Sequence, residues 1–183
     1  NFISERSGRI LESKNGFTLT GNESNDPNIA GTGFTAFVND STAVVDYCWF
    51  RGQWFDPVMI LWKNIESADI PNNLPVETPA PGASIYVPVN LKPGEEKTIE
   101  VYFCWYQPQS SLSTSKIPAT IINPVTYKPW YAGKFQNLSE VVNFWRMNYS
   151  DLKKKSENFR DAFFSSSLPP EVIEAVAANF TIL

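Results

Sequence analysis

Hydrophobic and polar residues alternate in two segments near the middle of the chain, at 82–91 and 98–105. The sequence LKPGEEK lies between them and places Pro93 and Gly94, two residues typical of tight turns, at its centre. Two alternating segments joined by a turn predict a β-hairpin, because side chains two positions apart lie on the same face of a strand. The face predicted to be buried consists of Ile85, Val87, Val89, Ile99, Val101, Phe103 and Trp105.

Short runs of β-branched and aromatic residues predict further strands in the first part of the chain, at 9–13, 16–21, 32–38 and 43–50. Many short strands separated by turn residues are typical of an antiparallel β-sandwich. We therefore expect a mainly β fold over the first two thirds of the chain.

One helix is expected to interrupt these strands, in the sequence WFDPVMILWKNIES. Asp56 suits the N-cap position, and Pro57 suits the first helical position because its missing N–H group would be unpaired there. Apolar residues then recur at helical spacing, at Val58, Leu61, Trp62 and Ile65. This spacing predicts a short amphipathic helix that lies on a sheet.

The period of the hydrophobic pattern changes after residue 133. Asn137 is a good N-cap, and Glu140 three residues later completes the sequence of a capping box. Steps of four and three residues then place a seam of side chains along one side of a helix of about 26 residues. The seam consists of Leu138, Val142, Trp145, Tyr149, Leu152, Ser156, Phe159 and Phe163.

The last segment of the chain, 170–183, has the pattern of a helix that is apolar on nearly every side. Pro169 and Pro170 suit its start, and Glu171 complements the positive end of the helix dipole. A helix of this kind is typical of the interior of a larger domain. We therefore expect a β-sandwich over 1–133, a long connector helix over 134–164, and the first helix of a further helical domain over 165–183. The alternative is a C-terminal helix docked on its own domain.

The composition narrows the possible chemistry. The chain has no histidine, which removes Ser–His and Cys–His nucleophile pairs and most zinc sites, so no metal site and no cofactor are expected.

The net charge is −4 and no stripe of Lys and Arg is present, so no nucleic-acid partner is expected. Cys48 and Cys104 lie in strand-like runs, as buried free thiols or as a disulfide between neighbouring strands.

A pair of carboxylates is the remaining route to autonomous catalysis, as in glycoside hydrolysis. Four acids lie in structured segments, but no catalytic environment can be assigned to any of them: Asp46, Asp56, Glu66 and Glu100. Asp56 is better explained as a helix cap, and Glu100 lies on the outward side of its predicted strand. No catalytic residue is therefore predicted.

Aromatic residues make up 14% of the chain, and exposed aromatic faces can bind sugars by stacking. Two neighbouring pairs could form such a platform, Trp130 with Tyr131 and Trp105 with Tyr106. Trp105 and Trp62 fall on the apolar faces of their predicted elements, which indicates ordinary core positions. Trp130 and Tyr131 are therefore the candidates for a sugar contact or an interdomain contact.

The order of these features resembles glycoside hydrolase family 116, the non-lysosomal glucosylceramidase or bile-acid β-glucosidase family. In GASIYVPVNLKPGEEKTIEVYFCWYQP, the family's Leu-x-Pro-Gly turn and Trp-x-x-Pro strand end match Leu91, Pro93, Gly94, Trp105 and Pro108. The sequence from YKPWYAG to the C-terminus is similar to the family's long helix and the start of its (α/α)₆ barrel. The likeness covers Gly82 to Leu183 well and 43–70 loosely, whereas 22–42 departs from the family pattern.

The resemblance implies that this chain is the later part of an N-terminal β-sandwich domain in a retaining β-glucosidase. In the family the nucleophilic glutamate and the acid/base aspartate lie in the barrel, and no position here matches either motif. The chain alone is therefore expected to be inactive. It is expected to buttress the helical catalytic domain of the parent chain and to contribute a wall of the cleft. The implied substrate, bound through that domain, is a β-glucoside or a glucosylceramide-like lipid.

Two other functions stay open. A stand-alone carbohydrate-binding module would need an exposed aromatic platform but not the long helix. A small complete hydrolase would need two facing carboxylates in a cleft. Without the barrel, the apolar C-terminal helices need cover, and we expect a homodimer of the chain formed through them. Folding back on the sandwich and disorder are the other outcomes.

Overall fold

A computed structural model of the chain describes residues 9–21, 29–52, 54, 56–110 and 127–179. Of these residues, 34% are helical and 21% lie in strands, so the fold is mixed α and β rather than mainly β. The chain divides into two units, Asn1–Val142 and Asn143–Leu183. Within the described ranges, no helix has both the length and the apolar character needed to cross a membrane.

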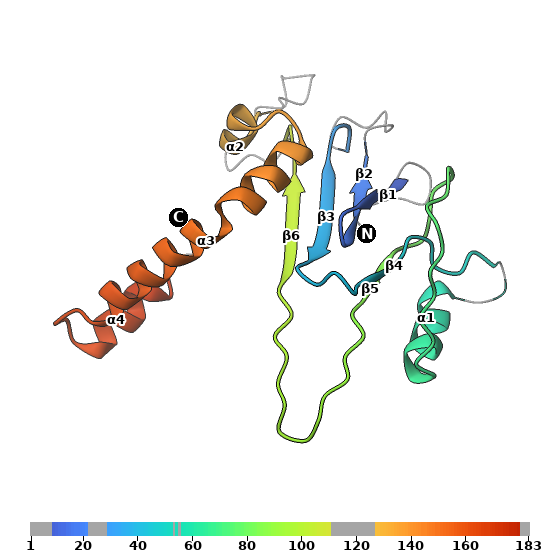
Figure 1. Cartoon of the computed structure of the whole chain (residues 1–183). Coiled ribbons are helices and arrows are strands. Elements are labelled where there is room, and N and C mark those ends of the chain that lie inside the picture. Colours follow the sequence, from blue (N-terminus) through green and yellow to red (C-terminus); the bar gives the residue numbers. More distant parts are fainter. Residues whose placement is uncertain (1–8, 22–28, 53, 55, 111–126, 180–183) are drawn as a thin grey trace. The chain divides into compact units, whose positions relative to one another are not determined.

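The larger sheet has four antiparallel strands in the order β1-β2-β3-β6 (Figure 1). The strands are β1 (Arg9–Ser13), β2 (Gly16–Thr20), β3 (Gly33–Val38) and β6 (Val101–Tyr106). A tight turn joins β1 to β2, and Asn15 in this turn has a φ of 53°, a left-handed conformation that asparagine tolerates. The predictions of β1, β2 and β3 are confirmed to within a residue, because runs of β-branched and aromatic residues mark them locally.

The smaller sheet pairs two short antiparallel strands, β4 (Val44–Asp46) and β5 (Ser84–Tyr86). Trp49, just after β4, extends this pairing: its backbone N–H donates to the carbonyl of Gly82 at 3.0 Å, and its indole N–H donates to Ser84 Oγ at 2.8 Å. A Cβ atom at position 82 would lie 2.5 Å from the Trp49 ring, so only glycine fits there.

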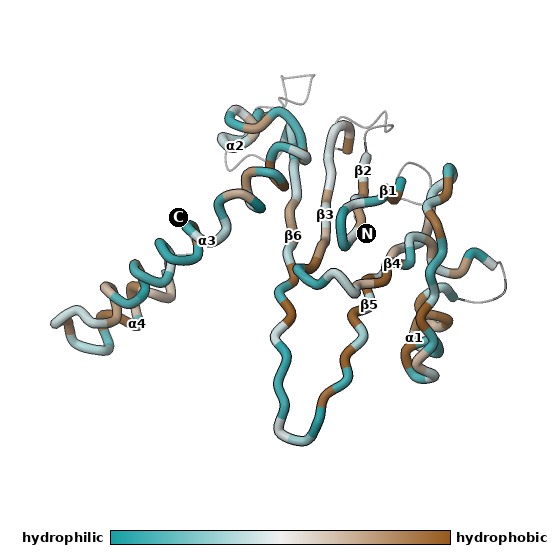
Figure 2. Tube along the Cα trace, viewed as in Figure 1, coloured by the Kyte–Doolittle hydropathy of each residue, from teal (hydrophilic) through white to brown (hydrophobic). Residues whose placement is uncertain are grey.

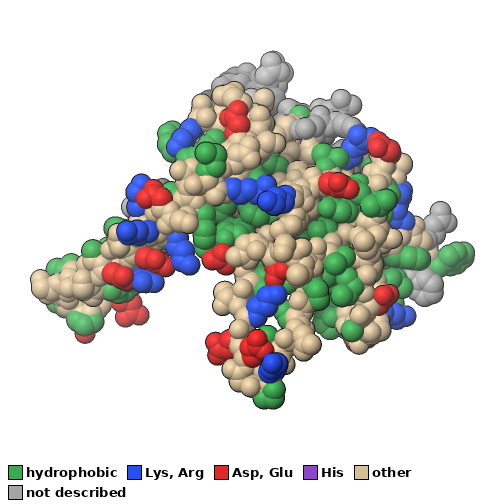
Figure 3. Space-filling view, viewed as in Figure 1, with side chains coloured by type: hydrophobic (Ala, Val, Ile, Leu, Met, Phe, Trp, Pro, Cys, Tyr) green, Lys and Arg blue, Asp and Glu red, His purple; other side chains and the backbone are tan. Residues whose placement is uncertain are grey.

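Two extended arms, 87–91 and 96–100, connect β5 to β6 through the predicted turn (Figure 1). The turn is confirmed, because Glu95 N donates to Lys92 O at 2.9 Å and Gly94 has a φ of 80°. Hydrophobic and hydrophilic residues alternate along the first arm, whereas the second arm is mostly hydrophilic (Figure 2), and charged side chains of both signs gather at their tip (Figure 3).

The predicted hairpin between these two segments is nevertheless wrong. β5 pairs with β4, and β6 pairs with β3, so the two strands belong to different sheets. A turn reverses the direction of the chain, but the choice of a pairing partner depends on which strand edge lies alongside. Local alternation cannot supply that information.

Helix α1 (Pro57–Glu66) begins as predicted. Asp56 Oδ1 accepts hydrogen bonds from the backbone N–H groups of Val58 at 2.7 Å and Met59 at 3.3 Å. The expectation that its apolar stripe lies on a sheet is wrong, because Val58, Trp62 and Ile65 are each at least half exposed. The apolar residues recur along the helix as the sequence predicted, but no described strand or helix covers these three side chains.

Helix α2 (Trp130–Lys134) and the first residues of α3 (Leu138–Phe164) complete the first unit. The predicted cap of α3 is confirmed: Glu140 N donates to Asn137 Oδ1 at 3.0 Å. The Glu140 carboxylate accepts from Gln136 N at 2.8 Å, one residue before the position that a standard capping box uses. Of the predicted seam, Val142 is buried, whereas Phe159 near the far end is 60% exposed.

The second unit contains the rest of α3 and helix α4 (Pro170–Ala177), and the chain reverses direction between them (Figure 1). The predicted helix start at Pro170 is confirmed, and Glu171 lies in its first turn. Ile173 is buried in a groove of about 600 Å³ that the end of α3 and the connecting turn also line. The last predicted helical residues, 180–183, lie outside the described residues.

The core of the first unit is small and centres on β3. Its buried apolar residues include Ile10, Ala36, Phe37, Val38 and Val45. Both cysteines are buried free thiols, so the disulfide alternative is not observed. Burial raises the pKa of the Cys48 thiol, which the nearby Arg51 charge partly counteracts.

Candidate functional site

The two faces of β6 differ sharply in exposure. Cys104 and Tyr106 on one face are 5% and 4% exposed. On the other face, the three side chains that we call the β6 face are 51%, 59% and 61% exposed: Val101, Phe103 and Trp105. The sequence predicted the β6 face to be buried, and for these residues the prediction is wrong.

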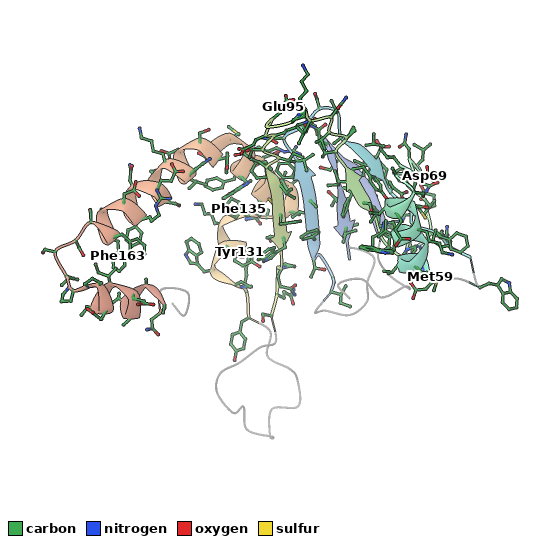
Figure 4. All side chains as sticks on the ribbon, turned by 90° about the horizontal axis from the view of Figure 1, so that it is seen from below. Met59, Asp69, Glu95, Tyr131, Phe135 and Phe163 are labelled. Atoms are coloured by element: carbon green, nitrogen blue, oxygen red, sulfur yellow. The ribbon has the colours of Figure 1, made fainter. Side chains whose placement is uncertain are left out.

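The covered side of β6 lies under α2 and the start of α3. The Tyr106 hydroxyl donates to Phe135 O at 3.0 Å, and its ring meets the Tyr131 ring edge-on, with centroids 6.2 Å apart. Figure 4 shows Tyr131 and Phe135 beside β6. Burial raises the pKa of Tyr106, and the neighbouring Tyr131 and Glu140 raise it further.

Gly33 on β3 allows this cover to approach closely. It pairs with Tyr106 in the sheet register, and a Cβ atom at position 33 would lie 2.7 Å from Leu138 Cδ2. The first residue of α3 therefore packs directly on the backbone of the sheet.

The β6 face continues across the sheet as an apolar surface. Trp105 is opposite Phe34, Phe103 is opposite Ala36, and Val101 is opposite Val38. The rings of Phe34 and Phe103 stack with centroids 5.8 Å apart. Ala36 and Val38 are only 4% exposed, so the exposure is concentrated on β6, at the end of the described sheet.

The two predicted contact residues, Trp130 and Tyr131, have different surroundings. Trp130 is 83% exposed. The Tyr131 hydroxyl accepts from Gln107 N at 3.0 Å and donates to Gln107 O at 3.1 Å, which ties α2 to the end of β6. The two rings therefore do not form one aromatic platform. Nothing in the sequence indicated Gln107, because this residue holds Tyr131 through its backbone N–H and carbonyl groups, which every residue type except proline has.

Three of the four acids considered for catalysis hold structural hydrogen bonds. Asp56 caps α1, and Asp46 accepts from Cys48 N at 3.2 Å and Asn73 Nδ2 at 2.9 Å. Glu100 accepts from Asn39 Nδ2 at 2.7 Å and from the Tyr102 hydroxyl at 2.6 Å. Across the described part of the chain, no group of three or more Cys, Asp and Glu residues is arranged to hold a metal ion.

No protein-family model, curated protein or solved structure matches this chain.

Proposed function

We propose that the chain is a non-catalytic segment of the N-terminal β-sandwich domain of a retaining β-glucosidase or glucosylceramidase-type glycoside hydrolase. Its two antiparallel sheets would belong to that sandwich, over 1–133. The connector helix would span 134–164, and 165–183 would begin the helical catalytic domain. Its role is to buttress that domain and to help wall the sugar-binding cleft. The resemblance of 82–183 to glycoside hydrolase family 116 supports this proposal.

The exposed β6 face is the observation that carries the proposal. Burying a large apolar side chain stabilises a protein by about 1.5–3 kcal/mol. Because the three side chains of the β6 face are each more than half exposed to water, covering them would add to this stabilisation. A contiguous apolar patch on a protein surface marks an interaction site. We assign its cover to another part of the parent polypeptide, because a support for a catalytic domain needs such an interface.

A stand-alone carbohydrate-binding module is the second candidate. It is favoured by Trp130, whose ring is 83% exposed and therefore accessible to a sugar. A module of this kind would bind its ligand without a catalytic domain, and substitutions on the β6 face would not alter its binding.

The test of the accessory role compares the Trp105→Ser and Phe103→Ser variants in the parent polypeptide and in this chain alone. In the chain alone the melting temperature should change little, because both side chains are more than half exposed. In the parent polypeptide, the same changes should lower the melting temperature and the hydrolysis of an aryl β-glucoside. The matched control is Trp54→Ser, which removes a 91% exposed tryptophan elsewhere. A parent enzyme that responds equally to Trp54→Ser and Trp105→Ser would contradict the proposal.

The chain alone should not hydrolyse the aryl β-glucoside. Turnover that survives repurification and disappears when one Asp or Glu of this chain is changed would replace the accessory role by that of a small complete hydrolase.

A further inference from the structure

A cavity of about 590 Å³ lies between the segment after β4, helix α1 and the returning segment 69–76, all within the first unit. We call it the α1 pocket. Its volume is within the range of pockets that hold small molecules, roughly 300–1,000 Å³. Asp46, one of the four acids considered for catalysis, lines it, but the sequence did not predict the pocket, because its walls come from separate segments between residues 46 and 76 that no local pattern connects.

A buried carboxylate lines the α1 pocket. Asp46 is 2% exposed, and its Oδ1 atom accepts from Cys48 N and Asn73 Nδ2. Asn73 Nδ2 also donates to Cys48 O at 3.1 Å, so the amide is held on both sides. These bonds hold the carboxylate in place in the pocket wall, and a carboxylate can accept more hydrogen bonds than these two.

Three further polar side chains line the α1 pocket. Asn64, on α1, is half-buried, and its amide group offers both a donor and an acceptor. Asp69 and Arg51 are exposed, and Asp69 lies beside the end of α1 (Figure 4). The polar groups of the pocket therefore include acceptors and donors, with two carboxylates and one guanidinium.

The rest of the wall is hydrophobic. Trp49 lines the pocket, and its indole is held in one orientation by the bond to Ser84 and by contact with Gly82. The α1 residues Ile60 and Leu61 add aliphatic surface. A ligand that fits this pocket therefore has an apolar face as well as hydrogen-bonding groups.

We propose that the α1 pocket binds a neutral polyhydroxylated ligand, of the size of a hexose unit. Hydroxyl groups donate to carboxylates and accept from Asn64 and Arg51, so one ligand satisfies both kinds of partner. The C–H face of a sugar ring would cover the hydrophobic wall. An anion such as a phosphate would be disfavoured, because it would meet the buried Asp46 charge.

The choice of a sugar as the ligand rests in part on the proposed role in a glucoside hydrolase. The existence of the pocket does not depend on that role. The β6-face variants test the accessory role and do not alter this pocket, so the two proposals fail separately.

The experiment is a titration of the ¹⁵N-labelled chain with D-glucose into the millimolar range, followed by NMR of the indole N–H signals. We expect a saturable shift of the Trp49 indole signal, and a weaker response to glucose 6-phosphate. The Asn64→Ala variant should weaken glucose binding about tenfold or more, because it removes a donor and an acceptor. The matched control is Asn90→Ala, an exposed position on the first arm, which should bind glucose as the unchanged chain does.

Three results would overturn the proposal. They are the absence of a saturable shift, equal glucose binding by the Asn64→Ala and Asn90→Ala variants, and tighter binding of glucose 6-phosphate than of glucose. The amide spectrum of each variant reports whether its fold is intact. Asn64→Ala should keep the fold, because its side chain is partly exposed on α1 and alanine favours a helix.

Discussion

The two faces of β6 show that the more hydrophobic side of a strand need not be the more buried one. The more apolar face, with Phe103 and Trp105, is exposed, whereas the face with Cys104 and Tyr106 is almost completely buried. The difference arises from what lies above each face. Helix α2 and the start of α3 cover the second face, and the carbonyl of Phe135, between the two helices, accepts the hydrogen bond of the Tyr106 hydroxyl. Burial thus follows from the presence of a cover, and hydrophobicity shows only where a cover would be favourable.

The largest expected difference comes from truncating neighbouring residues on the two faces. Tyr106→Ala should lower the free energy of unfolding by about 3–5 kcal/mol, because it removes a buried aromatic ring. Trp105→Ala should cost less than about 1 kcal/mol, since it loses mainly a cross-strand contact with Phe34. Urea denaturation of the isolated chain, followed by circular dichroism, measures both values.

Tyr106→Phe is the control within this pair. It keeps the ring and removes only the hydrogen bond to Phe135 O, so a loss of about 1 kcal/mol is expected. Equal losses for Tyr106→Ala and Trp105→Ala would show that both faces are covered in solution, and would refute the contrast between them.

The second prediction concerns the close approach of α3 to the covered face. Gly33→Ala should destabilise the chain by about 1–3 kcal/mol, because its Cβ atom would collide with Leu138. The same substitution at Gly133 is the matched control. Gly133 lies in α2 with no atom within 4 Å of its added Cβ, so Gly133→Ala should be neutral or stabilise by up to about 1 kcal/mol. Thermal melts should therefore show a lower melting temperature for Gly33→Ala and an unchanged or higher one for Gly133→Ala, and an equal loss in both variants would contradict the packing described for Gly33.

A smaller effect is expected at the cap of the helix that provides this cover. Asn137→Ala should cost about 1 kcal/mol, because the N–H group of Glu140 loses its acceptor. Asn137→Asp keeps an acceptor at the same position and should retain most of the stability. If the cap is responsible, the melting temperature should fall for Asn137→Ala and much less for Asn137→Asp. If any substitution at this position destabilises the chain, the melting temperatures of both variants should fall alike.

The smallest effect is expected at the ion pair that ties the second arm to the loop after β3. Hydrogen bonds from Lys97 and then Thr42 hold the pKa of Asp40 well below its usual range. Because the folded-state pKa is lower than the unfolded one, this contribution is present at neutral pH. It is lost as the pH falls below about 4, the ordinary pKa of an aspartate, toward the folded-state value.

The Asp40→Asn variant measures this contribution. It should be slightly less stable than the unchanged chain at pH 7, and the gap should shrink in acid. Urea midpoints at neutral and acidic pH provide the comparison. The effect should stay small because the Lys97 end of the pair is exposed to solvent, and ion pairs near the surface contribute little. A gap that widens in acid would show that the charged form of Asp40 does not stabilise the folded chain.

Local features of this chain could be predicted from the sequence alone. Asp56 with Pro57 marked the start of α1, Asn137 with Glu140 marked the start of α3, and Pro93 with Gly94 marked the turn. Each of these depends on contacts between residues at most four positions apart. The side-chain types at those positions are therefore sufficient to determine the backbone conformation.

Only the tertiary structure decided how these elements pair and which faces they bury. β5 and β6 join different sheets, Tyr131 turns inward to Gln107, and Trp105 stays exposed. The α1 pocket likewise depends on segments distant in sequence. Alternation along a strand defines two faces but does not say which neighbour will cover either one. That choice depends on long-range contacts, whose free energies no local pattern contains.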